Sequence, residues 1–144
     1  IPLAMKESGI YHSVSRTSQG YAVAYEPAPW YRFWAEWDRE FHWRPGERVY
    51  NFSAVFAPTE LDTEIRHRWS YYDEEQGEWL VQDELSYPMA GGRDGGYRGH
   101  SYKYGVRPGR WRVDTVIPTG QILGRNEFDL VETDQQPELR EEVK

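Results

Sequence analysis

The chain of 144 residues contains no cysteine, which excludes disulfide bonds and thiolate chemistry. It also has no basic excess: 17 Lys and Arg against 24 Asp and Glu give a net charge of -7, with an isoelectric point near 5.1. Non-specific nucleic-acid binding needs a basic surface, so we expect no nucleic-acid partner. No apolar run approaches the ~20 residues of a membrane-spanning helix. No signal-peptide pattern is present, and the chain begins at Ile1, so we expect a piece of a longer protein whose membrane segment would lie upstream.

Aromatic residues are abundant. The chain has 7 Trp, 11 Tyr and 5 Phe, although its mean hydropathy is only -0.88. Each buried ring removes roughly 150–250 Å² from water. We therefore expect rings, including Trp69 and Trp111, to form the core in place of aliphatic side chains.

Most of the chain has the two-residue period of β-strands. Apolar side chains alternate with polar ones from Tyr50 to Phe56, from Ile65 to Tyr71 and from Trp111 to Ile117. Turn residues recur about every ten positions, and a change of face near Gly124 predicts a β-bulge. The pattern predicts an all-β protein, an antiparallel immunoglobulin-like β-sandwich with about eight strands.

One segment has a different period. Seven of the fourteen residues from Trp30 to Trp43 are aromatic, and rings recur at 30, 34, 37 and 41. This is the spacing of one helix face, with Pro29 in the first turn and Pro45–Gly46 after the end. We predict one short aromatic helix packed on the sandwich; a bent strand is the alternative, because Trp30 and Trp34 also alternate with polar residues.

The domain organisation follows from composition. We expect a single β-sandwich domain over residues 1–132. The stretch 133–144 is acidic and lacks rings, so we expect a disordered or loosely attached tail there.

Several short motifs resemble one bacterial family, the domain of unknown function 2914. An Ala57–Pro58 strand end, His67-x-Trp69 and Pro108-Gly109-x-Trp111-x-Val113 carry the resemblance over about Arg48 to Val131. The Gly-rich loop is similar to that of the subset at the C-terminal end of multi-pass membrane proteins. The resemblance implies an all-β domain tethered to a membrane in the bacterial cell envelope, and it implies no activity.

Metal and cofactor chemistry has little support. The four histidines are His12, His42, His67 and His100, and no two of them have the spacing that places two metal ligands on one element. We expect no metal and no cofactor. His67 shares the inward face of its strand with Trp69, so we expect a buried, hydrogen-bonded histidine.

Two surfaces are candidates for ligand binding. The first is the loop from Gly91 to Gly99, in which five glycines surround Arg93, Asp94, Tyr97 and Arg98. It has neither the Walker nor the dinucleotide spacing; it is either a binding loop or a compact turn whose ion pair is structural. The second surface is the aromatic segment, with Trp30, Trp34 and Trp37 as a sugar-stacking platform, a cover of the sandwich or a membrane-interface anchor.

The expected function is a non-catalytic, envelope-associated binding module for a protein partner, its own membrane domain or a glycan. One alternative is a carbohydrate-active enzyme with a carboxylate pair, for which Asp83 or Glu84 with Asp94 or Asp114 are the candidates. No spacing singles out such a pair, and no nucleophile motif occurs, so we expect no enzyme. The other alternative is a purely structural domain.

Overall fold

The protein is described here by a computed structural model, which describes residues 3–27, 39–57, 64–87, 90–91 and 96–144. These residues form strands and no helix. The strands are β1 (Ala4–Tyr11), β2 (Ser13–Thr17), β3 (Gly20–Tyr25), β4 (Arg39–Trp43), β5 (Val49–Phe56), β6 (Arg66–Asp73), β7 (Glu78–Ser86), β8 (Ala90–Gly91), β9 (Tyr97–Lys103), β10 (Gly109–Val116), β11 (Ile122–Glu132) and β12 (Arg140–Val143). None of the described segments is a helix long and apolar enough to cross a membrane.

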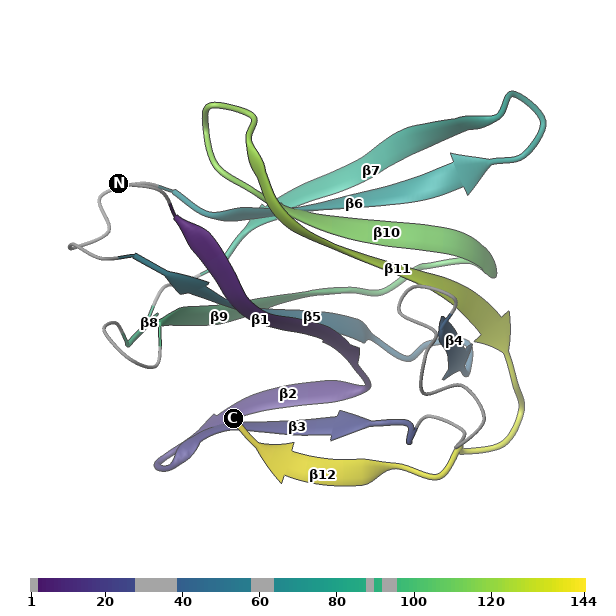
Figure 1. The fold of residues 1–144 in the computed structure, drawn as a ribbon. Helices are drawn as coiled ribbons and strands as arrows, with labels where there is room; N and C mark the ends of the chain where they lie inside the picture. The colour runs from purple at the N-terminus through teal and green to yellow at the C-terminus, as the bar shows by residue number, and fades with distance from the viewer. Residues whose placement is uncertain (1–2, 28–38, 58–63, 88–89, 92–95) are drawn as a thin grey trace.

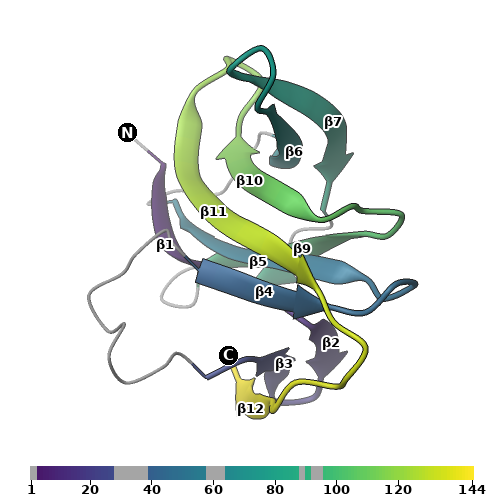
Figure 2. The ribbon, with the colours of Figure 1, turned by 90° about the vertical axis from the view of Figure 1, so that its right-hand side faces the viewer.

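The strands form three layers (Figures 1 and 2). The upper layer is a five-stranded sheet in the order β4-β11-β10-β6-β7, and the middle layer is a four-stranded sheet in the order β1-β5-β9-β8. A small sheet of order β12-β3-β2 lies below the middle layer. Every described pairing is antiparallel except that of β4 with β11, which is parallel. The all-β prediction is therefore confirmed.

The main core lies between the upper and middle sheets. Trp69 and Trp111 are 0% and 2% exposed, and they pack with Val113 and Phe128 from the upper sheet and Val49 from the middle one. The prediction that tryptophan rings form the core is confirmed. Burial of such large rings contributes most of the hydrophobic stabilisation of this layer.

β5 is buried on both faces, because the small sheet covers the side that faces away from the main core. Phe52 packs there against Tyr11, Tyr21 and Val23 in a second apolar cluster. The opposite face carries Asn51 and Ser53, which are fully buried. The alternation predicted for β5 is correct, but its polar face points into the molecule and not to water.

The helix prediction is wrong for residues 39–43, which form β4, and residues 28–38 lie outside the described part of the chain. Phe41 and Trp43, two residues apart, are both buried in the main core. β4 adds to the edge of the five-stranded sheet, where Phe41 pairs with Leu130 of β11. Residues 39–43 form a strand and not a helix because the two-residue spacing of Phe41 and Trp43 buries both rings, and because the edge of β11 offers backbone hydrogen bonds.

The expectation of a disordered tail is wrong for residues 140–144. Arg140 to Val143 pair with Tyr25 to Ala22 on the edge of β3. β2 and β3 pair as a hairpin. The bulge predicted near Gly124 is confirmed: Thr115 pairs with Gly124 and Val116 with Ile122, so the register shifts there. Acidic composition did not prevent pairing, because backbone hydrogen bonds carry the contact.

Candidate functional site

The two surfaces expected from the sequence are only partly described. Arg93, Asp94, Trp30, Trp34 and Trp37 lie outside the described residues. Tyr97 and Arg98, which were expected in a loop, lie on strand β9 and pair in register with Val55 and Ala54 of β5.

Arg98 has a structural partner. Its Nη1 donates to the carbonyl oxygen of Lys144 at 3.0 Å, and its guanidinium lies 5.4 Å from the ring centroid of Tyr21. The Tyr21 hydroxyl in turn donates to the Arg98 carbonyl at 3.4 Å. This side chain therefore joins the middle sheet to the small sheet.

A groove of about 460 Å³ lies beside the turn between β6 and β7, and we call it the hairpin groove. It is lined by rings, carboxylates and guanidinium groups: Tyr71, Tyr72, Asp73, Glu74, Glu75, Leu80, Arg107, Gly109 and Arg110. The carboxylates come from the hairpin and the arginines from the segment before and at the start of β10. The groove thus combines ring faces with both donors and acceptors of hydrogen bonds.

Cation–π contacts fix the two arginines of the hairpin groove. The Arg107 guanidinium lies 4.0 Å from the Tyr71 ring centroid, and that of Arg110 lies 5.3 Å from the Tyr72 ring centroid. The Tyr71 hydroxyl donates to the Pro108 carbonyl at 2.8 Å. A Cβ at Gly109, whose φ is +138°, would overlap this hydroxyl, so glycine is required there. Side chains held in this way form a preorganised surface.

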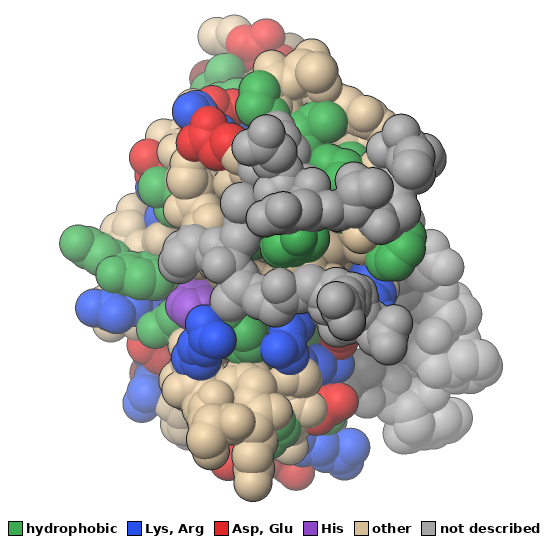
Figure 3. All heavy atoms as spheres, turned by 90° about the vertical axis from the view of Figure 1, so that its left-hand side faces the viewer, with side chains coloured by type: hydrophobic (Ala, Val, Ile, Leu, Met, Phe, Trp, Pro, Cys, Tyr) green, Lys and Arg blue, Asp and Glu red, His purple; other side chains and the backbone are tan. Residues whose placement is uncertain are grey.

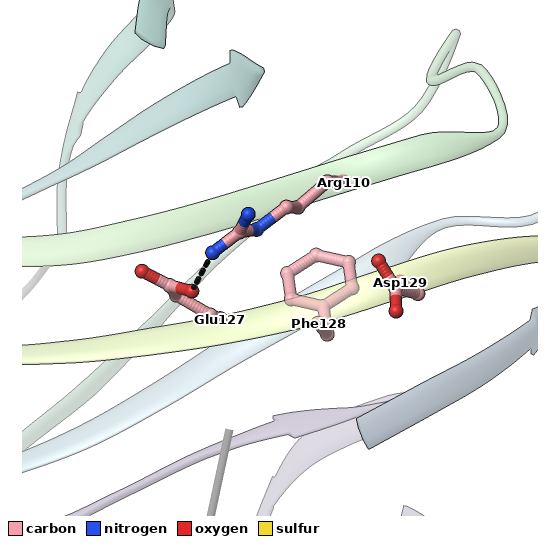
Figure 4. Close-up of a pocket in the computed structure, with 4 residues that line it drawn as sticks. All are labelled: Arg110, Glu127, Phe128 and Asp129. Carbon is pink, nitrogen blue, oxygen red and sulfur yellow. Dashed lines mark hydrogen bonds and ion pairs between the residues drawn. The ribbon is translucent and has the colours of Figure 1, made fainter. Parts of the chain in front are cut away.

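A second, smaller pocket of about 230 Å³ adjoins the hairpin groove at Arg110, and we call it the β11 pocket (Figure 4). Its lining adds Glu127, Phe128 and Asp129 of β11. Arg110 Nη2 donates to Glu127 Oε2 at 3.0 Å, so the pocket holds a bound pair of opposite charges. Arg110 borders both cavities and could donate to a ligand that spans them.

An exposed aromatic cluster lies on the middle sheet, and we call it the tyrosine patch: Tyr50, Tyr102, Tyr104 and the guanidinium of Arg48. Tyr102 and Tyr104 are 41% and 64% exposed, and their rings are 6.4 Å apart with only 21° between their planes. Arg48 lies 4.5 Å from the Tyr102 ring centroid. The patch offers nearly parallel ring faces to solvent.

Charge is mixed across the surface. On the face shown in Figure 3, Lys and Arg side chains are interspersed with Asp and Glu. The acids that the sequence offered as a catalytic pair each contact a cation: Lys103 binds Asp83, Arg68 Nε donates to Glu84 at 2.6 Å, and Arg125 Nε donates to Asp114 at 2.6 Å. Asp94, the fourth candidate, lies outside the described residues.

His67 is buried in the main core, as predicted. Its two ring nitrogens are hydrogen-bonded to Ser53 Oγ at 2.8 Å and Ser101 Oγ at 2.6 Å. The indole Nε1 of Trp69 also donates to Ser101 Oγ at 3.2 Å. Burial lowers the pKa of His67 to about 3, with a smaller effect from His100. The ring is therefore neutral, and its complete burial denies it any contact with a substrate.

A carboxylate between two histidines joins the small sheet to β4. Glu26 Oε2 lies 2.7 Å from His12 Nε2, and Glu26 Oε1 lies 2.5 Å from His42 Nδ1. Burial raises the pKa of Glu26, but hydrogen bonds from His12 and from the backbone and side chain of His42 lower it below its usual value. Among the residues that can be described, no group of three or more His, Cys, Asp or Glu side chains is placed to hold a metal ion.

The sequence did not predict the hairpin groove. Part of the groove can be recognised in the sequence, because the rings of Tyr71 and Tyr72 precede the acidic turn and that of Trp79 follows it. The missing information is the approach of Arg107 and Arg110, more than thirty residues later in the chain, to the Tyr71 and Tyr72 rings. Only the pairing of β10 with β6 brings them together.

Comparison with known proteins finds a matching family model whose description names no activity. The family described as "Protein of unknown function (DUF2914)" matches residues 62–130, which supports the resemblance found in the sequence motifs. No curated protein matches the chain. Among solved structures, a Pseudomonas fluorescens alkylpurine DNA glycosylase, AlkC, bound to DNA containing an abasic site analogue, is similar at 19% identity and a TM-score of 0.39. The alignment covers 62% of this chain and 27% of that chain.

Proposed function

We propose that this domain is a non-catalytic binding module and that the hairpin groove takes an uncharged carbohydrate chain. The observation that carries the proposal is the combination in one groove of ring faces, two guanidinium groups and three hairpin carboxylates. Sugars present apolar faces that stack on rings and hydroxyl groups that both donate and accept hydrogen bonds.

The charges of the groove favour an uncharged ligand. Arg110 is already paired with Glu127, and three acids of the hairpin face the same cavity. A phosphate or sulfate group would meet these carboxylates, whereas a hydroxyl group can accept from an arginine and donate to a carboxylate. The adjoining β11 pocket would take a neighbouring sugar unit, since Arg110 borders both cavities.

Two further parts of the proposal rest on the sequence and the strand order. The order β1-β5-β9-β8 facing β11-β10-β6, with a buried Trp69 on β6, supports an immunoglobulin-like sandwich. The family resemblance supports a position in the bacterial cell envelope. Pairing of Asp83, Glu84 and Asp114 with cations favours a binding module over a glycoside hydrolase.

A protein partner is the second candidate, and the tyrosine patch supports it. Tyr and Arg are enriched where protein interfaces concentrate their binding energy. Tyr102 and Tyr104 are exposed, and Arg48 lies against them.

The test compares the two surfaces with matched variants. A glycan array on the whole chain selects a sugar, and calorimetry then measures its dissociation constant for wild type, Tyr72→Ala, Arg107→Ala and Tyr104→Ala. Loss of one stacking ring or donor costs about 1–3 kcal/mol. We therefore expect the dissociation constant to rise at least 5-fold for Tyr72→Ala and Arg107→Ala, and to stay unchanged for Tyr104→Ala. Binding of no glycan, or equal binding by all four proteins, would reject the hairpin groove as a carbohydrate site. Weakening by Tyr104→Ala alone would move the site to the tyrosine patch.

A further inference from the structure

The last strand of the chain is held by groups from three other strands. The backbone of Lys144 exchanges two hydrogen bonds with Tyr21 of β3, with N···O distances of 3.1 and 2.7 Å. Arg98 of β9 donates to the Lys144 carbonyl at 3.0 Å, and the Lys144 ammonium lies 2.5 Å from Glu7 of β1. These contacts converge on one residue, so the edge of β3 carries a receptor for a lysine that follows an extended strand.

Gly20 completes this receptor. Its φ is +136°, and a Cβ at this position would overlap the carbonyl oxygen of Lys144. The residue that begins β3 therefore leaves room for the backbone that docks there. This close approach distinguishes the site from an ordinary free sheet edge.

The strand that fills the receptor is bound almost wholly through its backbone. All four residues of β12 are exposed, including Val143 at 53%. Release of β12 therefore opens no apolar core, but it leaves the hydrogen-bonding groups of the β3 edge without partners. Such an edge pairs readily with another extended segment.

The connection to β11 permits an exchange. The backbone of Thr133 is held by a hydrogen bond to the Trp43 carbonyl at 2.9 Å, and residues 134–139 then lead to β12 without belonging to a strand. Figure 1 shows this connection running from the upper sheet, past the middle one, to the small sheet. A strand at the end of such a connection can reach a neighbouring molecule with little change elsewhere.

We propose that the edge of β3 is a strand-acceptor site and that its intermolecular ligand is β12 of a second copy of this chain. The second copy supplies the same lysine to Glu7, the same carbonyl to Arg98 and the same backbone register. Every contact of the closed chain is remade between copies, so the exchange changes the connectivity and not the contacts, and it is favoured by high protein concentration.

The test uses the absence of cysteine from the chain. Ala22 and Val143 face each other across β3 and β12, so Ala22→Cys and Val143→Cys report directly on docking. The two single variants, one of them labelled with nitrogen-15, are mixed at about 1 mM, incubated and oxidised, and mass spectrometry identifies the linked peptides. Gln121→Cys, in an exposed turn, replaces Val143→Cys in the control for random collision.

We expect at least 10-fold more linkage between copies for the position 22 and 143 pair than for the control pair, and a loss of most of it on dilution before oxidation. The double variant Ala22→Cys/Val143→Cys measures docking within one chain. Linkage within that double variant and none above the collision level between mixed singles would overturn the proposal, and so would the absence of both.

Discussion

The buried His67 illustrates how one side chain links the core to pH. The unfolded chain binds a proton at this histidine below about pH 6.5, whereas the folded chain does so only near pH 3. Between these values the unfolded state binds more protons, so acidification destabilises the fold, by at most about 1.4 kcal/mol per pH unit from this group.

The prediction is that urea unfolding of the wild type between pH 7 and pH 4 shows a falling free energy of unfolding, and that His67→Gln flattens this dependence by close to one proton. His67→Gln also lowers stability at pH 7, by about 1–3 kcal/mol, because the glutamine cannot meet both Ser53 and Ser101 in the same geometry. His100, whose pKa burial also lowers, and Glu26 remain in both proteins, so the difference isolates His67. Equal slopes for the two proteins would contradict a neutral, buried imidazole.

Single residues were predicted best where one physical rule dominates. The burial of His67, Trp69 and Trp111 follows from the two-residue period, because each lies on the apolar face of its strand. Asn51 and Ser53 could not be predicted as buried, since their face looks polar until their partners on the other sheet, Asn126 and His67, are known.

At the scale of elements, the local sequence predicted the wrong secondary structure for two segments, and both segments pair with the edge of a sheet. The ring spacing before Pro45 favours a helix, but residues 39–43 gain backbone hydrogen bonds by joining β11 in parallel. β12 has the composition of a disordered tail, and the receptor on β3 orders it. In both cases the pairing partner lies more than eighty residues away in the sequence, beyond the reach of a local pattern.

The prediction for β12 concerns hydrogen exchange. Gly20→Ala forces a Cβ against the Lys144 carbonyl and should release the strand. The amide of Tyr21 donates to Lys144, and by the alternation of an antiparallel pair those of Val23 and Tyr25 also face β12. We expect these three amides to exchange at least 10-fold faster in the variant.

The amides of Ala22 and Ala24 face β2 and provide the internal control. They should keep their protection if only β12 is lost. Loss of protection throughout β3 would mean that Gly20→Ala unfolds the whole small sheet, and unchanged exchange everywhere would mean that the overlap at Gly20 is relieved without release of the strand.

The whole molecule has two cores of different size, and this predicts two modes of opening. The main core contains Val113 and the second cluster contains Val23, and both valines are 1% exposed. Either Val→Ala change removes the same two methyl groups and should cost about 1–3 kcal/mol. The difference lies in which amides lose protection.

We expect Val113→Ala to lower the protection of all slowly exchanging amides together, because the main core spans the upper and middle sheets. Val23→Ala should mainly expose β2 and β3, which form a separate layer below β5. Native-state hydrogen exchange at low denaturant measures both. A uniform loss of protection in both variants would show that the three layers unfold as one unit.

β5 has no side that faces water over most of its length, since one face meets the main core and the other the second cluster. Substitutions in β5 must therefore preserve packing against both clusters, and few replacements can do so. The turn between β10 and β11 has the opposite freedom, since residues 118–121 are exposed to solvent. Evolutionary variation, and any peptide that an engineer wishes to insert, should accumulate at that turn and stay out of the strand at the molecule's centre.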